Sequence, residues 1–320
     1  MRCACIDIGA NTTRLLVAEP AGGGGLREVA ARRAFSHLGA GRAGRTAAEP
    51  EREALTAILG LVVAQQADEA RALGAAHLRV VATAALRDAP DCEAVLAALR
   101  DAAPGAAVDV LTTEEEARLA FLGATALLRD PPPGVLGVID VGGGSTELAV
   151  GERGRPPAWS ISLPLGSATL TDAHLRGDPP GEEELAAARE TIAAAMARAG
   201  VVTSAGVVGR GVAPFPRPVA AAYAVGGSAS SVRRLAGPVL GAGALAAALV
   251  ALTAGPAAQV AARHALHPRR VALLPAGILL LEAASEVLGA APRSCRGGLR
   301  EGVVLTELAR VGGWGHGQGT

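Results

Sequence analysis

Two glycine-rich segments of this chain carry the residue types that could bind a phosphate and a metal ion. Residues 7–17 read DIGANTTRLLV and residues 140–150 read DVGGGSTELAV. In a turn rich in glycine and small hydroxyl residues, successive backbone N–H groups point into a concavity that binds anions. The Asp that opens each segment can hold a hydrated divalent cation against that anion. The main chemical difference is Arg14 in the first segment and Glu147 in the second.

The two segments align without a gap at a separation of 133 positions, which predicts two lobes of similar construction. The apolar runs Cys3–Ile8 and Val135–Val141 before the turns predict strand–turn–strand hairpins. A third glycine-rich stretch, 226–230, follows a short predicted strand, 223–225, and precedes a helix predicted from Ser231. It therefore predicts a third loop that receives an anion at a helix N-terminus. It lacks the full G-x-G-x-x-G pattern of a Rossmann dinucleotide site.

The metal site predicted from these segments consists of Asp7 and Asp140, brought face to face across a cleft. A general base is predicted in the run Glu114–Glu116, at the start of a helix over 114–128 that Thr112 or Thr113 caps. Three Glu at a helix start also complement the helix dipole, so the run has a purely structural interpretation as well. Both interpretations stay open from the residues alone.

A basic residue that could neutralise a phosphate follows the strand predicted over 77–83. Arg87 is the basic residue of the loop expected there, and its guanidinium can bind phosphate with two hydrogen bonds. The alternative is an ordinary surface arginine.

The elements around these motifs alternate between helix and strand. Helices are predicted over 49–73, 91–100 and 181–199, and a strand over 108–111. The sequence DPPPG at 130–134 breaks the chain and places the lobe boundary there, giving lobes over 1–129 and 130–298. Gly297 and Gly298 open a last helix over 299–310, which we expect to pack back on the N-terminal lobe. The glycine-rich tail 312–320 is expected to be disordered.

Composition excludes several classes of function. All 30 Lys and Arg residues are Arg, which excludes a Walker-type P-loop and a Schiff-base lysine. Aromatic residues make up 2% of the chain and the net charge is zero, so neither nucleic acid nor a membrane is an expected partner. The four cysteines lack zinc-site spacing and no secretory segment precedes Cys3, which predicts reduced thiols in the cytoplasm. Arg and Glu interrupt the Ala-rich stretches, so no membrane span is expected.

The motifs resemble those of the Ppx/GppA phosphatase family, within the actin, sugar-kinase and Hsp70 superfamily. The first segment is similar to the family's D-x-G-S-N-S-x-R-L, with Ala10 in place of the first Ser. Segment 139–147 matches the most specific family signature and is intact. Ala82-Thr83 with Arg87 resembles A-T-x-x-x-R, and residues 115–119 resemble the E-E-A-x-L of a further element.

Later blocks extend the resemblance from Cys5 to about Leu308. They read LPLG at 163–166, LLPAG at 273–277 and GLREG at 298–302. The resemblance implies an α/β fold of two actin-like (ribonuclease H-like) lobes, each with a mixed central sheet flanked by helices, and an active site in the interlobe cleft.

The resemblance also implies residue roles. Glu116 would be the general base that activates water, while Asp140 and Glu147 would organise the metal and the water, and Asp7 would complete the metal site. The metal would be Mg²⁺ or another divalent cation. The residues expected to bind phosphate lie in the three glycine-rich turns and after the strand over 77–83: Gly9, Asn11, Thr12, Arg87, Gly142, Gly143, Gly144, Ser145, Gly227 and Ser228.

Four functions stay open. The first is an exopolyphosphatase that hydrolyses the terminal phosphoanhydride of inorganic polyphosphate, with a preference for short chains. The second is a phosphohydrolase of guanosine pentaphosphate (pppGpp). An ATP-dependent kinase or chaperone-like ATPase of the superfamily is disfavoured by Glu116 and Glu147, and a non-catalytic sensor by the intact acidic residues. The expected partner is polyphosphate or pppGpp, and a homodimer stays open.

Overall fold

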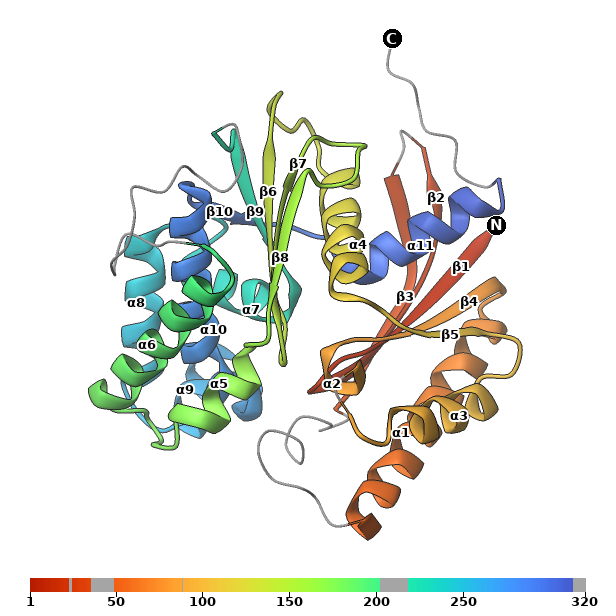
Figure 1. The fold of residues 1–320 in the computed structure, drawn as a ribbon, viewed down its shortest axis with the longest axis horizontal. Coiled ribbons are helices and arrows are strands. Elements are labelled where there is room, and N and C mark those ends of the chain that lie inside the picture. The colour runs from red at the N-terminus through yellow and green to blue at the C-terminus, as the bar shows by residue number, and fades with distance from the viewer. Residues whose placement is uncertain (23–24, 36–48, 88, 202–217, 313–320) are drawn as a thin grey trace. The chain divides into compact units, whose positions relative to one another are not determined.

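The chain consists of two compact units (Figure 1). The computed structural model describes residues 1–22, 25–35, 49–87, 89–201 and 218–312. Unit 1 contains residues 1–127 together with 297–320, and unit 2 contains residues 128–296. Most of the predicted tail, residues 313–320, lies outside the described residues.

In the described residues, each unit has one five-stranded sheet with helices packed against it. The strands are β1 (Arg2–Ile8), β2 (Thr12–Ala21), β3 (Gly25–Phe35), β4 (Ala75–Ala82), β5 (Ala107–Val110), β6 (Leu136–Val141), β7 (Thr146–Gly151), β8 (Trp159–Leu163), β9 (Ala221–Val225) and β10 (Pro292–Ser294). The helices are α1 (Glu49–Ala72), α2 (Ala84–Arg87), α3 (Cys92–Ala102), α4 (Thr113–Ala126), α5 (Ser167–His174), α6 (Glu182–Arg198), α7 (Gly226–Ala236), α8 (Ala242–Thr253), α9 (Ala257–His264), α10 (Pro268–Leu288) and α11 (Leu299–Arg310).

The two sheets have the same topology. Sheet 1 has the order β3-β2-β1-β4-β5, and sheet 2 has the order β10-β9-β6-β7-β8, which is the same arrangement read from the other edge. In each, three antiparallel strands that follow one another in the chain are extended by two parallel strands on the far side of the first. The internal repeat in the sequence is therefore a repeat of the whole sheet.

The alternation of β1 divides the interior of unit 1 into two layers. Ala4, Ile6 and Ile8 pack with α1 and α3 on one face of sheet 1. Cys3 and Cys5 lie on the other face, among the buried side chains of α4 and α11. Asp7 continues this second row, because it has the same parity along the strand. The metal-binding candidate of unit 1 thus lies on the face that α4 and α11 cover.

Glycines allow α4 and α11 to cross at backbone contact. A Cβ at Gly302 would overlap the carbonyl oxygen of Leu119, and one at Gly123 would overlap the carbonyl oxygen of Gly298. Two helices with larger residues at these positions would be held further apart. The chain returns from unit 2 to make this crossing, so the last helix packs on residues of the first 127 (Figure 1).

Helix α10 is the core helix of unit 2. It contacts α5, α6, α7, α8 and α9, and its side chains from Val271 to Leu288 supply much of that unit's apolar core. By length and composition alone, it is apolar enough to cross a membrane, but 67% of its most apolar window is buried inside the protein. Burial of this kind is the property of a core helix in a folded unit.

Most predicted elements are present, with ends shifted by one to three residues. The helix predicted over 49–73 is α1 and the strand predicted over 77–83 is β4. The stretch 226–230 was wrongly predicted as a loop: it is the first turn of α7. The position of Arg87 in a loop was also wrong, since it ends the short helix α2, where Thr83 O accepts the N–H groups of Leu86 and Arg87. β3, β8, β10, α5, α8, α9 and α10 carried no prediction.

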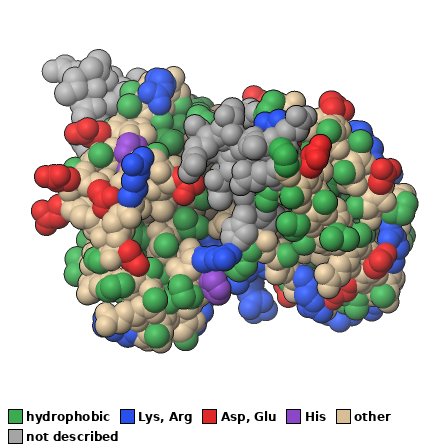
Figure 2. All heavy atoms as spheres, turned by 90° about the horizontal axis from the view of Figure 1, so that it is seen from below, with side chains coloured by type: hydrophobic (Ala, Val, Ile, Leu, Met, Phe, Trp, Pro, Cys, Tyr) green, Lys and Arg blue, Asp and Glu red, His purple; other side chains and the backbone are tan. Residues whose placement is uncertain are grey.

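The described surface has no single-sign character on the face drawn in Figure 2. Acidic and basic side chains are interspersed there with apolar and neutral ones. This distribution agrees with the formal net charge of zero.

The glycine crossing predicts a position-specific stability effect. We expect Gly302→Ala to lower the free energy of unfolding by about 1–3 kcal/mol, because a backbone oxygen must move to admit the new methyl group. Gly60→Ala is the matched control in helix α1, since a Cβ there meets nothing within 4 Å. That variant should be neutral or more stable by up to about 1 kcal/mol. Urea unfolding measures both, and equal midpoints for the two variants would contradict the crossing.

Candidate active site

The two predicted hairpins close in the same way. Gly9 N–H donates to Thr12 O at 3.1 Å, and Gly142 N–H donates to Ser145 O at 3.0 Å. Each hairpin therefore has a two-residue tip, formed by residues 10–11 in unit 1 and 143–144 in unit 2. Two-residue tips are the tightest common connection between antiparallel strands, and they fix the register of the pair.

The N-terminus of α5 supports the tip in unit 2. Ser167 N–H donates to Gly142 O at 2.9 Å, and the N–H groups of Ala168 and Thr169 donate to Gly143 O at 2.9 and 3.1 Å. The carbonyl groups of the turn are thus held toward α5. Within the described residues, the N–H groups of Gly143 and Gly144 have no acceptor. A rigid turn with unused N–H donors is the arrangement expected of an anion-binding nest.

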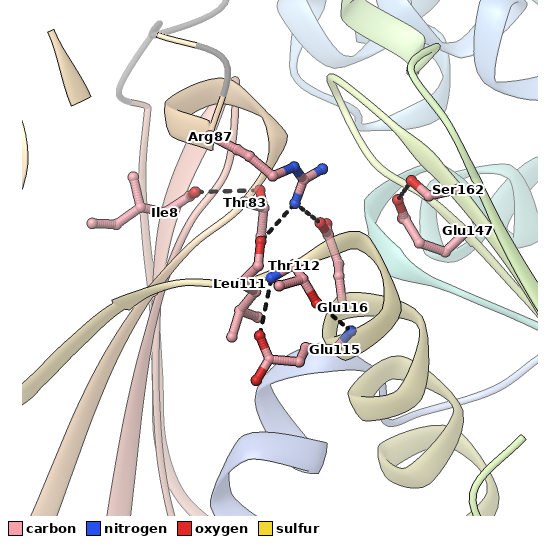
Figure 3. Close-up of polar contacts among 9 residues, drawn as sticks. All are labelled: Ile8, Thr83, Arg87, Leu111, Thr112, Glu115, Glu116, Glu147 and Ser162. Atoms are coloured by element: carbon pink, nitrogen blue, oxygen red, sulfur yellow. Dashed lines mark hydrogen bonds and ion pairs between the residues drawn. The ribbon is translucent and has the colours of Figure 1, made fainter. Parts of the chain in front are cut away.

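The register of sheet 2 lines up three oxygen-bearing side chains. Asp140 of β6 lies directly opposite Glu147 of β7, which lies opposite Ser162 of β8. Directly paired residues of neighbouring strands share one face of the sheet. Glu147 is 3% exposed, and Ser162 Oγ donates to its Oε1 at 2.8 Å (Figure 3). Two carboxylates therefore stand side by side next to the glycine turn.

The start of α7 meets the side chain of Asp140. Gly226, the first residue of the helix, has a φ of 85°, and a Cβ there would overlap Asp140 Oδ1. Only glycine allows the strand to enter the helix directly beside this carboxylate. This contact explains why residues 226–230 form the first turn of α7 and not the predicted loop. Because Ser228 is 1% exposed and packs against Gly277 of α10, its hydroxyl is turned into the core.

The equivalent row in unit 1 is built from different residues. Asp7 of β1 lies opposite Arg14 of β2, whose Nε donates to Thr12 Oγ1 at 3.2 Å. Burial raises the pKa of the Asp7 carboxyl, and the charges of Arg14 and Arg300 oppose that rise. Asn11 at the tip of this hairpin is half-buried.

Two residues near Asp7 were missed in the sequence. Arg300 and Glu301 at the start of α11 both act on the pKa of the Asp7 carboxyl, Arg300 lowering it and Glu301 raising it. Arg300 Nη1 also lies 3.5 Å from Leu15 O of β2. The GLREG block at 298–302 was recognised as a family resemblance, but it carried no role. The sequence did offer one signal: Arg300 and Glu301 are oppositely charged neighbours at the start of a predicted helix that follows two glycines.

Arg87 and Glu116 form an ion pair within unit 1 (Figure 3). Arg87 Nη1 donates to Leu111 O at 2.7 Å and lies 3.3 Å from Glu116 Oε2. The side chain of Glu116 is 8% exposed and that of Arg87 is 22% exposed. A candidate base and a candidate phosphate ligand, 29 residues apart in the sequence, are thus held together by one guanidinium nitrogen.

Thr112 decides where α4 begins and therefore where Glu116 lies. Thr112 Oγ1 accepts the N–H of Glu115 at 3.2 Å, and the Glu115 carboxylate accepts the N–H of Thr112 at 3.0 Å. This reciprocal capping box fixes the first turn of the helix. Backbone and Thr hydroxyl donors lower the pKa of Glu114 at the same end. Glu114 and Glu115 thus have the structural role of helix capping, whereas Glu116 alone is buried.

The carboxylates of Asp140 and Glu147 fit a hard divalent cation whose coordination is completed by the substrate. In the part of the chain that the structure describes, no group of three or more His, Cys, Asp and Glu side chains forms a metal cluster. Asp140 and Glu147 are directly paired on neighbouring strands and would supply two carboxylate ligands. Mg²⁺ in phosphate-binding sites is commonly held by one or two carboxylates, with phosphate oxygens and water completing its coordination. These residues would hold such an ion, which would neutralise charge on a phosphate.

Comparison with known proteins identifies the family of this chain. The sequence model of the Ppx/GppA phosphatase family matches residues 29–311. The chain belongs to the Ppx/GppA phosphatase family. It is 30% identical over 314 residues to Exopolyphosphatase 1 of Mycobacterium tuberculosis, covering 96% of this chain and 88% of that protein.

Other Ppx/GppA relatives match over shorter regions. Exopolyphosphatase 2 of Mycobacterium tuberculosis is 36% identical over 203 residues, so the match spans only about 60% of that relative's length and 60% of this chain. A guanosine-5'-triphosphate,3'-diphosphate pyrophosphatase of Pseudoalteromonas atlantica is 36% identical over 112 residues, which are 35% of this chain and 22% of that protein.

The fold of this Ppx/GppA chain matches solved structures over its full length. The crystal structure of the Aquifex aeolicus family member aligns with a TM-score of 0.75 and 26% identity, covering 97% of this chain and 98% of that one. The predicted fold class, α/β with two actin-like lobes built on mixed sheets flanked by helices, is confirmed. The resemblance stated from the motifs is confirmed as well.

The Arg87–Glu116 pair predicts a measurable coupling in stability. In a double-mutant cycle with Arg87→Ala and Glu116→Ala, we expect a coupling of about 1–3 kcal/mol, because removing one partner leaves the other charge poorly solvated. The control cycle is the Arg79–Asp109 pair of unit 1, in which the Asp109 side chain is 45% exposed. That cycle should give about 1 kcal/mol or less. Urea unfolding measures the coupling energy of both pairs. Equal coupling energies would show that burial does not strengthen the Arg87–Glu116 ion pair.

Proposed function

We propose that the chain is an exopolyphosphatase that hydrolyses the terminal phosphoanhydride of inorganic polyphosphate, with a preference for short chains, and releases orthophosphate in the cytoplasm. The proposal assigns roles to Arg87, Glu116, Asp140, Glu147 and the turn 142–145. The relative named Exopolyphosphatase 1, which matches 96% of this chain, supports the reaction class. Four free thiols agree with the compartment.

The observation that carries the proposal is the row in unit 2. Asp140 and Glu147 stand opposite each other beside a turn whose tip has two unused N–H donors. Phosphoryl transfer needs a cradle for the phosphate and neutralisation of its charge, and little covalent chemistry from the protein. The N–H groups of Gly143 and Gly144 would hold the oxygens of the terminal phosphate. Mg²⁺ bound to the two carboxylates would supply charge neutralisation.

Glu116 is proposed as the general base that accepts a proton from the attacking water. Its carboxylate is buried, and Arg87 Nη1 lies 3.3 Å from Glu116 Oε2, which orients the carboxylate. Arg87 would also neutralise phosphate through the donors that it does not use on Leu111 and Glu116. Water would attack the terminal phosphorus, the bond to the bridging oxygen would break, and the shortened chain would leave.

Guanosine pentaphosphate is the second candidate substrate. A relative named for the pyrophosphatase reaction on that nucleotide matches 112 residues of this chain. Both substrates end in a phosphoanhydride, so the groups proposed above serve either one. The lean toward polyphosphate rests on the two exopolyphosphatases that match over longer regions.

The assigned base predicts a sharp contrast between neighbouring glutamates. Glu116→Gln should reduce orthophosphate release at least about 100-fold, since general-base catalysis contributes on the order of 10²–10⁴. Polyphosphate affinity should stay within about twofold, because the side chain keeps its size. Glu115→Gln is the control: it keeps the capping box and should leave activity unchanged. A Glu116→Gln protein with most of its activity would show that another group is the base.

A panel of four substrates tests the reaction itself. Orthophosphate release is measured in parallel on tripolyphosphate, long-chain polyphosphate, pppGpp and ATP in the presence of Mg²⁺. The proposal expects the highest kcat/KM on short polyphosphate. A higher value on pppGpp would favour the second candidate, and turnover restricted to ATP with a co-substrate would assign the chain to the kinases.

The metal role predicts a shift in Mg²⁺ dependence. Asp140→Asn should raise the Mg²⁺ concentration for half-maximal activity at least about tenfold, because one of the two carboxylate ligands becomes neutral. EDTA should abolish activity in the unaltered protein, and added Mg²⁺ should restore it. Asp101→Asn, an exposed change on α3, is the control and should keep the normal Mg²⁺ dependence. If Asp140→Asn and Asp101→Asn showed the same Mg²⁺ dependence, Asp140 would not be a metal ligand.

A further inference from the structure

An unusual charge pair lies at the edge of sheet 1. Arg33 of the edge strand β3 stands directly opposite Arg14 of β2, in an unbroken stretch of the register. Arg14 in turn stands opposite Asp7 of β1. Because directly paired residues share a face, all three side chains lie on the face that Asp7 occupies. The row therefore runs from a carboxylate at the centre of the sheet to two arginines at its edge.

Two like charges directly opposite each other on a sheet are destabilising. The equivalent pair in unit 2 avoids this cost, since Glu147 faces Ser162, which donates a hydrogen bond to it. The same position of the repeated sheet thus has a complementary pair in one unit and a repulsive pair in the other. An anion placed over Arg14 and Arg33 would convert that repulsion into attraction.

Arg33 is available for such an anion. It is exposed, and its guanidinium lies over the ring of Phe35 with 5.6 Å to the ring centroid. This stacking orients the guanidinium while leaving its hydrogen-bond donors unused. Within the described residues, no carboxylate lies within ion-pair distance of Arg33. Its neighbour Arg32 points to the opposite face, where it is paired with Glu69 at 2.6 Å.

We propose that Arg33, next to Arg14, is a phosphate-binding residue that engages a chain of phosphates. The inference rests on the proposed function for the identity of the substrate, a chain of phosphates. Arg33 therefore contributes affinity for the phosphate chain and has no part in the bond-breaking step.

The experiment compares Arg33→Ala with Arg32→Ala. Both variants remove one positive charge from adjacent positions of β3, but on opposite faces of the sheet. Affinity for long-chain inorganic polyphosphate is measured by calorimetry in EDTA, so that binding is observed without turnover. KM and kcat on the same polymer are then measured with Mg²⁺.

Arg33→Ala should weaken binding and raise KM by about tenfold, as expected for loss of a charge-assisted contact, while kcat stays within about twofold. Arg32→Ala should change either quantity by less than about twofold. Arg33→Lys should restore part of the affinity, because it keeps the charge but loses the planar fork. The weakening in Arg33→Ala should also shrink at high salt, where exposed charges are screened.

Equal effects of Arg33→Ala and Arg32→Ala would overturn the inference, since net charge alone would then account for them. Unchanged affinity in Arg33→Ala, or a loss in kcat with unchanged KM, would overturn it as well. If the unaltered protein binds polyphosphate in an Arg33-dependent way but releases no orthophosphate, the proposed function fails and the binding assignment stands.

Discussion

The tight closure of each hairpin is the constraint on which the candidate site depends. Gly9 to Thr12 and Gly142 to Ser145 close with the same hydrogen bond, so the residue five positions after each closing glycine always stands opposite the leading Asp. A slip of one residue would turn that side chain to the other face of the sheet. The closure therefore determines that Arg14 faces Asp7 and that Glu147 faces Asp140.

A second constraint acts on the elements that come from far along the chain. Glu116 is on α4 and Arg300 is on α11, and the two helices cross at glycine contacts over one face of sheet 1. The capping box at Thr112 fixes the start of α4, and Arg87 fixes the carboxylate of Glu116. The position of a single buried carboxylate thus depends on a cap, an ion pair and a helix crossing that includes residues near the C-terminus.

The sequence could predict what is local and repeated. The hairpins follow from apolar runs that flank glycine turns, and the shared topology follows from the alignment of residues 7–17 with 140–150. The start of α7 could not be predicted in this way, because it depends on contact between Gly226 and Asp140, 86 residues earlier. The Arg87–Glu116 pair likewise depends on the spatial adjacency of α2 and α4. The sequence did not single out Arg33 as a binding residue, because only its pairing with Arg14 in the sheet distinguishes it.

The duplicated sheet suggests how one scaffold divides the work of phosphate chemistry. In unit 2 the row beside the turn is acidic and hydrogen-bonded, which suits a cation and a terminal phosphate. In unit 1 the same row ends in two arginines, which suits the phosphates of a chain. The row of unit 1 has one carboxylate and two arginines, whereas the row of unit 2 has two carboxylates and a serine. Two sheets of the same topology therefore acquire different electrostatic character through the residues at two paired positions, Arg14 with Arg33 and Glu147 with Ser162.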